Sequence, residues 1–170
     1  GGGDVFKINQ TLEEGSSIDG GAGYNGIVFG EDQADVSASK SVDVDMTNVG
    51  LTDIQQLFLE GDGTRVVVTA EQLTEDGMSI SSMNNSPAER TDPTGSGANG
   101  QTLVVEIDGT ESGATATDLT SVTFDAFSLE DSAFSWDSAE DSVEIKGSTS
   151  DDTISGTTVA DVITGGSGSD

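Results

Sequence analysis

The C-terminus of the chain is built on a nine-residue repeat. Residues 147–155 read GSTSDDTIS, residues 156–164 read GTTVADVIT, and residues 165–170 read GGSGSD, all in one frame. The sixth position of each unit is an aspartate, and the eighth position of the two complete units is an isoleucine. A short fixed period indicates a solenoid, in which each unit buries its apolar face only against its neighbours.

The same pattern recurs near the N-terminus. Residues 20–28 read GGAGYNGIV, which puts Asn25 at the aspartate position and Ile27 at the aliphatic position. Before them, Asp4 and Phe6 fit the second half of a unit. Asp4 and Asn25 are 21 positions apart (25 − 4) instead of twice nine, so we expect inserted residues between them, within 13–17.

These units resemble G-G-x-G-x-D-x-U-x, where U is a large aliphatic residue, the nonapeptide of the RTX or haemolysin-type calcium-binding repeat. Residues 165–170 match it at every available position, whereas the two units before them carry Ser148, Ser150, Thr157 and Val159 where glycine is expected. The resemblance implies a right-handed parallel β-roll with two units per turn and calcium ions between loops one turn apart. It also implies type I secretion, with folding on calcium outside the cell.

The resemblance further implies that Asp152 and Asp170 belong to one column of loops and Asp161 to the opposite column. Glycine permits a positive φ, so the loop carbonyls can turn inward, and calcium takes about six to eight oxygen ligands from carboxylates and carbonyls. The candidate metal-site residues are Asp4, Gly20, Gly21, Gly23, Asn25, Gly147, Asp152, Gly156, Asp161, Gly165, Gly166, Gly168 and Asp170.

Residues 29–146 contain no complete unit, but their pattern predicts strands. Short apolar runs such as 66–68 and 103–107 are separated by turn residues, and no long segment has helical periodicity. Thr69 and Gln72 have the spacing of a capping box, which predicts one helical turn over 70–73. We expect an all-β chain with parallel β-roll or β-helix coils at both ends and a middle that is either solenoid or sandwich-like.

Four parts are expected along the chain. Residues 1–83 form an N-terminal β-solenoid part with repeat-like loops, and residues 84–100, which contain both prolines, form a flexible loop or linker. Residues 101–146 form a second β-rich part, and residues 147–170 form the C-terminal repeats.

Charge narrows the choice of partners. Five basic residues face 32 acidic ones, a net charge of −27, so nucleic acid and anionic membrane surfaces would repel the chain. No apolar run approaches the roughly 20 residues that a membrane-spanning helix needs. Calcium ions are the expected partners. The chain has no cysteine and no histidine, which excludes disulfides, thiol nucleophiles and imidazole bases.

The predicted function is a calcium-dependent structural module of a secreted repeat protein, and not an enzyme. Asp43, Asp45 and Thr47 begin like an EF-hand loop, but Asn48 and Ile54 stand where that loop needs glycine and glutamate, so we expect no EF-hand. Two alternatives stay open. One is an adhesin-type module that binds a glycan or cell-surface partner through residues 84–146, and the other is an accessory module of an extracellular hydrolase.

Overall fold

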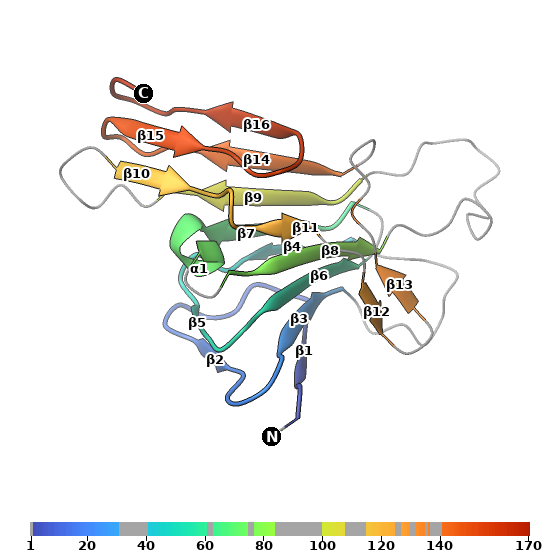
Figure 1. The fold of residues 1–170 in the computed structure, drawn as a ribbon. Helices are drawn as coiled ribbons and strands as arrows, with labels where there is room; N and C mark the ends of the chain where they lie inside the picture. Colours follow the sequence, from blue (N-terminus) through green and yellow to red (C-terminus); the bar gives the residue numbers. More distant parts are fainter. Residues whose placement is uncertain are drawn as a thin grey trace.

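Two parallel sheets of five strands each make up most of the structure (Figure 1). It is a computed structural model that describes residues 2–30, 41–60, 63–74, 77–83, 100–107, 115–124, 127–129, 132–134, 136 and 141–170. The first sheet has the order β1 (Val5–Ile8), β3 (Gly26–Phe29), β6 (Gln56–Glu60), β8 (Ser79–Met83) and β11 (Thr123–Phe124). The second sheet has the order β4 (Asp43–Asp45), β7 (Arg65–Thr69), β9 (Thr102–Glu106), β14 (Ser142–Lys146) and β16 (Asp161–Thr164).

Along much of the chain, successive strands alternate between the two sheets. β3 is followed by β4, β6 by β7, and β8 by β9. We call one strand of the first sheet, together with the strand of the second sheet that follows it, a pass, so each pass adds one strand to each sheet. Every neighbouring pair within the two sheets is parallel. The strands therefore stack roughly in sequence order from the N-terminal to the C-terminal end (Figure 1).

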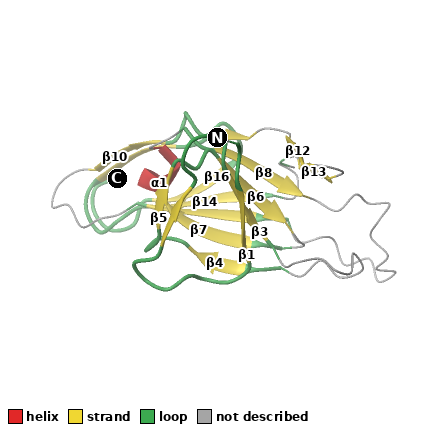
Figure 2. Ribbon diagram, turned by 90° about the horizontal axis from the view of Figure 1, so that it is seen from below, coloured by secondary structure: helices red, strands yellow, loops and turns green. Residues whose placement is uncertain are grey.

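Two pairs of short parallel strands and one short helix lie outside the two large sheets. β5 (Gly50–Thr52) pairs in parallel with β2 (Ser17–Asp19), and β10 (Thr115–Asp118) pairs in parallel with β15 (Asp152–Ser155). Between β7 and β8 the chain forms α1 (Ala70–Thr74) instead of a strand. Both views place β5, α1 and β10 on the same side of the two sheets (Figures 1 and 2). A single antiparallel pair among the described residues, β12 (Phe127–Leu129) with β13 (Ser132–Phe134), lies beside β8.

Inward-facing aliphatic side chains form columns that run through the stack. In the second sheet the register aligns Val44, Val66, Leu103 and Val143, each 0% exposed. In the first sheet it aligns Ile27, Leu57 and Ile80, also 0% exposed. A strand exposes alternate residues on opposite faces, so each pass adds one aliphatic side chain to each column. Another column of the second sheet extends to Ile163 on edge strand β16, where the side chain is 48% exposed.

The predicted all-β character is confirmed, with one short helix that the capping box also predicted. The Thr69 N–H donates to Gln72 Oε1 at 2.8 Å, and the Gln72 N–H donates to Thr69 Oγ1 at 3.2 Å. This reciprocal pair satisfies N–H groups at the start of α1 that have no partner within the helix. The helix extends one residue beyond the predicted turn, to Thr74.

The two sheets cross the expected domain boundaries. β7 pairs with β9 and β8 with β11 across residues 84–100, and β14 pairs with β16 across the start of the C-terminal repeats. The expected linker lies outside the described residues except for Gly100. A sandwich of the immunoglobulin type is built from antiparallel sheets, whereas the strands described in the middle of the chain, apart from β12 and β13, pair in parallel. In the part of the chain that is described, no helix has the length and apolar character to span a membrane.

We expect Leu103→Ala to destabilise the protein strongly, because it opens a cavity in the middle of a fully buried column. Truncations of this kind cost about 2–5 kcal/mol. Urea unfolding measures the loss. The matched control is Val162→Ala on the edge strand β16, a side chain that is 61% exposed, for which we expect less than about 1 kcal/mol. Equal losses for the two variants would contradict the assignment of the column.

Candidate calcium-binding loops

The loops formed by residues 147–152 and 165–170 lie one on the other. The Asp152 N–H donates to Asp170 Oδ1 at 3.0 Å, across a separation of 18 residues. A Cβ atom at Gly147 would collide with the Gly165 carbonyl, so the two loops can approach this closely only because Gly147 has no side chain. Asp152 and Asp170 therefore belong to two loops that are in direct contact. Asp161 begins β16 and so lies at the opposite end of that strand from the loop that ends in Asp170.

The Asp152 carboxylate is buried, with the residue only 3% exposed. Its Oδ2 accepts hydrogen bonds from the Ser148 N–H at 2.7 Å and from the Ser148 hydroxyl at 2.9 Å. The next unit repeats this arrangement, because the Thr157 N–H and hydroxyl donate to the Asp161 carboxylate at 2.8 and 2.7 Å. Ser148 and Thr157 stand where the nonapeptide has its second glycine, so each hydroxyl gives its aspartate a donor that glycine could not.

The first glycine of each unit lies against the aspartate side chain at the sixth position of that unit. A Cβ atom at Gly165 would be 2.6 Å from Asp170 Oδ2, and one at Gly147 would be 3.0 Å from Asp152 Oδ2. At Gly156 it would collide with the Asp161 carboxylate. The spacing of glycine and aspartate in the repeat therefore has a steric cause, since the carboxylate folds back over the position where a Cβ would be.

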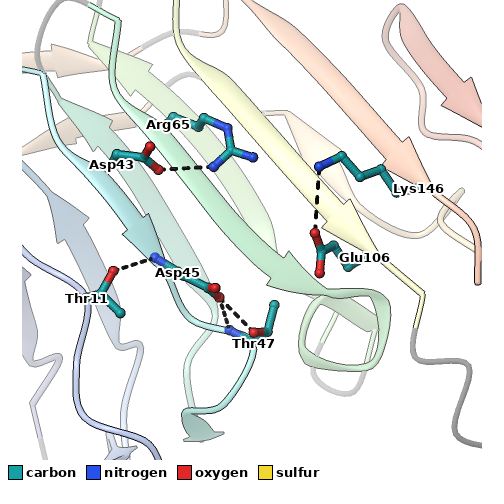
Figure 3. A network of polar contacts seen from close by, with 7 residues as sticks. All are labelled: Thr11, Asp43, Asp45, Thr47, Arg65, Glu106 and Lys146. Carbon is teal, nitrogen blue, oxygen red and sulfur yellow. Dashed lines mark hydrogen bonds and ion pairs between the residues drawn. The ribbon is translucent and has the colours of Figure 1, made fainter.

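The basic residues that the structure describes are paired with other carboxylates. The ion pairs are Lys7 with Glu60 at 3.4 Å, Arg65 with Asp43 at 3.1 Å and Lys146 with Glu106 at 3.7 Å. Figure 3 shows the last two on strands of the second sheet. Lys40 and Arg90 lie outside the described residues. Asp152 thus has no basic partner within the described part of the chain, although a buried charge is costly unless it is compensated.

The Asp45 carboxylate accepts hydrogen bonds from a residue of the turn that follows it. The N–H and hydroxyl of Thr47 donate to Asp45 Oδ1 at 2.9 and 2.7 Å, and the Asp45 N–H donates to Thr11 Oγ1 at 3.0 Å (Figure 3). A similar turn occurs at Asp118, where the hydroxyl and then the N–H of Thr120 lower the pKa of the carboxyl group below its usual value. Both hydrogen bonds favour the ionised form of this carboxyl group.

No three acidic side chains converge on one point within the described ranges. A calcium ion in the C-terminal loops would therefore take most of its ligands from carbonyl and hydroxyl oxygens, with Asp152 and Asp170 as the carboxylates. Calcium accepts such mixed oxygen sets. The oxygen atoms that these two loops offer are therefore of the kinds that bind calcium.

The loop formed by residues 20–25 has a backbone like that of residues 165–170. Gly21 and Gly166 have φ values of 65° and 103°, and Gly23 and Gly168 both have 142°. Glycine adopts these values without steric cost. The loop also stacks on its predecessor in the same way, because the Asp4 N–H donates to Asn25 Oδ1 at 2.9 Å. The Asp4 side chain itself is exposed.

Asn25 differs from the aspartates in what its side chain does. The residue is 0% exposed. Its Nδ2 donates to the Gly21 carbonyl at 3.1 Å and to the Asp53 carbonyl at 2.9 Å. The opposite orientation of the amide would put Oδ1 against these two carbonyl oxygens and Nδ2 against the Asp4 N–H, so this orientation alone satisfies every group. Both N–H bonds of Nδ2 and one lone pair of Oδ1 are therefore used within the protein, and the ligand role of Asn25 stays a prediction.

Polar side chains before the strands form a series that the sequence analysis missed. In each case a backbone N–H donates to the side-chain oxygen of a residue one pass later. The pairs are Asn25 with Gln55 at 2.9 Å, Thr64 with Gln101 at 2.8 Å and Gln101 with Asp141 at 2.8 Å, in addition to Asp4 with Asn25 and Asp152 with Asp170. The available signal was a glutamine or aspartate two positions before an aliphatic run, as in Gln101-Thr102-Leu103.

Comparison with protein-family models, with curated proteins and with solved structures found no match to this chain. The interpretation of the loops therefore depends on their residues and geometry.

We expect Gln101→Met to destabilise the protein by about 1–3 kcal/mol, because it leaves the buried Thr64 N–H without its acceptor. Gln101 is 1% exposed, so water cannot easily replace the lost oxygen. Gln10→Met, at an exposed position, is the control with the same change of side chain. Urea unfolding of both variants is the measurement, and a Gln101 variant as stable as the Gln10 variant would count against the proposed importance of these contacts.

Proposed function

We propose that this chain is a structural module of a secreted repeat protein similar to the RTX family. In this proposal the passes form a parallel β-solenoid, and the C-terminal loops bind calcium outside the cell. The observation that carries the proposal is the Asp152 carboxylate, buried beneath the loop that ends in Asp170 and without a basic partner among the described residues. A cation between the two loops would compensate this charge.

The parallel stacking supports a structural role over a catalytic one. In a solenoid each repeat contacts only its neighbours, so stability is transmitted along the stack. The continuous aliphatic columns and the hydrogen bonds between successive passes have this nearest-neighbour character. We therefore propose a scaffold that holds its shape along one axis and has no catalytic activity of its own.

The donors of the C-terminal loops suit calcium better than magnesium. Asp152, Asp170, the Ser148 hydroxyl and loop carbonyls are the available oxygens. Calcium accepts about six to eight ligands in flexible geometry at about 2.3–2.6 Å, whereas magnesium requires near-octahedral geometry at about 2.0–2.1 Å. The net charge of −27 further favours compaction in the presence of cations.

Calcium is expected to raise the melting temperature of the protein. An ion that binds only the folded state adds about 2.7 kcal/mol when its concentration is 100 times the dissociation constant, which corresponds to roughly 5–10 °C for a chain of this length. Thermal unfolding in millimolar calcium, in magnesium and in chelator measures the effect, with magnesium close to chelator. Hydrogen exchange should place the protection in residues 147–170.

Asp152→Asn tests the ligand, because it removes the charge and keeps the shape of the side chain. We expect it to lose more than half of the calcium-induced shift in melting temperature. Glu14→Gln removes one charge from an exposed position and should keep the full shift. Identical melting curves of the wild-type protein in calcium and in chelator would disprove the calcium-dependent part of the proposal.

A further inference from the structure

We infer that the side-chain amide of Asn25 takes the place of a cation in the loop formed by residues 20–25, so that the N-terminal end of the stack closes without metal. The inference goes beyond the proposed function and does not depend on calcium binding at the C-terminal loops. In this inference the residue at position 25 determines whether the loop needs a metal ion to fold.

Two loops at opposite ends of this chain have similar backbones. Residues 20–25 and 165–170 share their glycine positions, their positive φ values and the hydrogen bond from the preceding pass. Three of the six positions differ, and one of them is the residue that ends the loop, which is Asn25 in one and Asp170 in the other. One backbone arrangement thus carries an amide at one end of the chain and a carboxylate at the other.

The amide nitrogen of Asn25 lies between two backbone carbonyl groups. Nδ2 of Asn25 lies 3.1 Å from the carbonyl oxygen of Gly21, in its own loop, and 2.9 Å from that of Asp53, one pass later. Two carbonyl dipoles from successive passes point their negative ends at one atom. An ion between stacked loops would be surrounded in the same way, because calcium accepts backbone carbonyls as ligands. The two N–H bonds of the neutral amide direct their partial positive charges at these oxygens.

The backbone of Asn25 is hydrogen-bonded to the next pass on both its N–H and its carbonyl group. Its N–H donates to Gln55 Oε1 at 2.9 Å, and its carbonyl accepts the N–H groups of Gln55 and Gln56 at 2.9 and 3.2 Å. Asp53, whose carbonyl completes the site, has a φ of 54°, a value uncommon for residues other than glycine. With the Asp4 N–H on the other side, Asn25 connects three successive passes.

The inference predicts the effect of replacing Asn25 by aspartate. Asn25→Asp removes both N–H donors and places a carboxylate against two carbonyl oxygens in a buried site. Without a cation this arrangement is repulsive. With calcium, one carboxylate and two carbonyls are three oxygens of a suitable ligand set. The substitution should therefore make the N-terminal end of the stack depend on calcium.

The experiment compares Asn25→Asp with Asn48→Asp, which makes the same chemical change at an exposed position. In chelator we expect Asn25→Asp to melt roughly 5–10 °C below the wild type, since each unsatisfied buried group costs about 1–3 kcal/mol. Millimolar calcium should restore at least half of this loss beyond any shift that it causes in the wild type. Asn48→Asp should follow the wild type in both conditions. Hydrogen exchange in residues 20–26 of the Asn25 variant should slow on addition of calcium.

Two results would overturn the inference. One is an Asn25→Asp protein as stable in chelator as Asn48→Asp, and the other is a destabilised variant that calcium does not restore. If the variant fails to fold in both conditions, the wild-type protein decides, by calcium titration of the backbone amide NMR signals of residues 20–26. Unmoved signals support the inference, and saturable shifts overturn it. Signals of residues 147–170 in the same titration report separately on the proposed function.

Discussion

Each strand of the two sheets obtains its backbone hydrogen bonds from the strands one pass away, since no two consecutive strands of these sheets form a hairpin in the described chain. A parallel pair cannot be joined by a tight turn, so the chain must leave a sheet, cross to the other and return at the correct register. The corners where strands begin therefore decide whether the stack forms. Polar side chains at these corners bind the backbone of the neighbouring pass, and this contact recurs from Asp4 to Asp170.

Different side-chain groups bind the backbone of the neighbouring pass at different corners. The amide oxygens of Gln55 and Gln101 accept a hydrogen bond from a backbone N–H one pass earlier, and the carboxylate of Asp141 does the same. The amide of Asn25 accepts such a bond and also donates to a backbone carbonyl. At the C-terminal end, Ser148 and Thr157 satisfy the aspartates of their own units with N–H and hydroxyl donors. Neutral amides complete their hydrogen bonds within the protein, whereas a buried carboxylate retains a charge that needs compensation.

The proposed calcium site and the inferred role of Asn25 together describe a stack whose two ends differ. The N-terminal loops would hold their shape from hydrogen bonds alone, and the C-terminal loops would need a cation. Such a gradient follows from nearest-neighbour stability, because an ion stabilises mainly the repeats that it contacts. In a chain of net charge −27, an end that closed without metal would give the remaining passes a folded edge on which to pair.

The sequence by itself determined the all-β character, the repeat frame of the C-terminal loops and the capped turn at Thr69, because each depends on residues close together in the chain. It also indicated that residues 20–25 and 165–170 form similar loops. Only the tertiary structure decided that the strands between the repeats continue the parallel stack, since pairing partners there are separated by long and unequal segments. It also decided what Asn25 does. The repeat frame places an asparagine at the aspartate position, but it does not show that the carbonyl of Asp53, 28 residues away, accepts a hydrogen bond from its nitrogen.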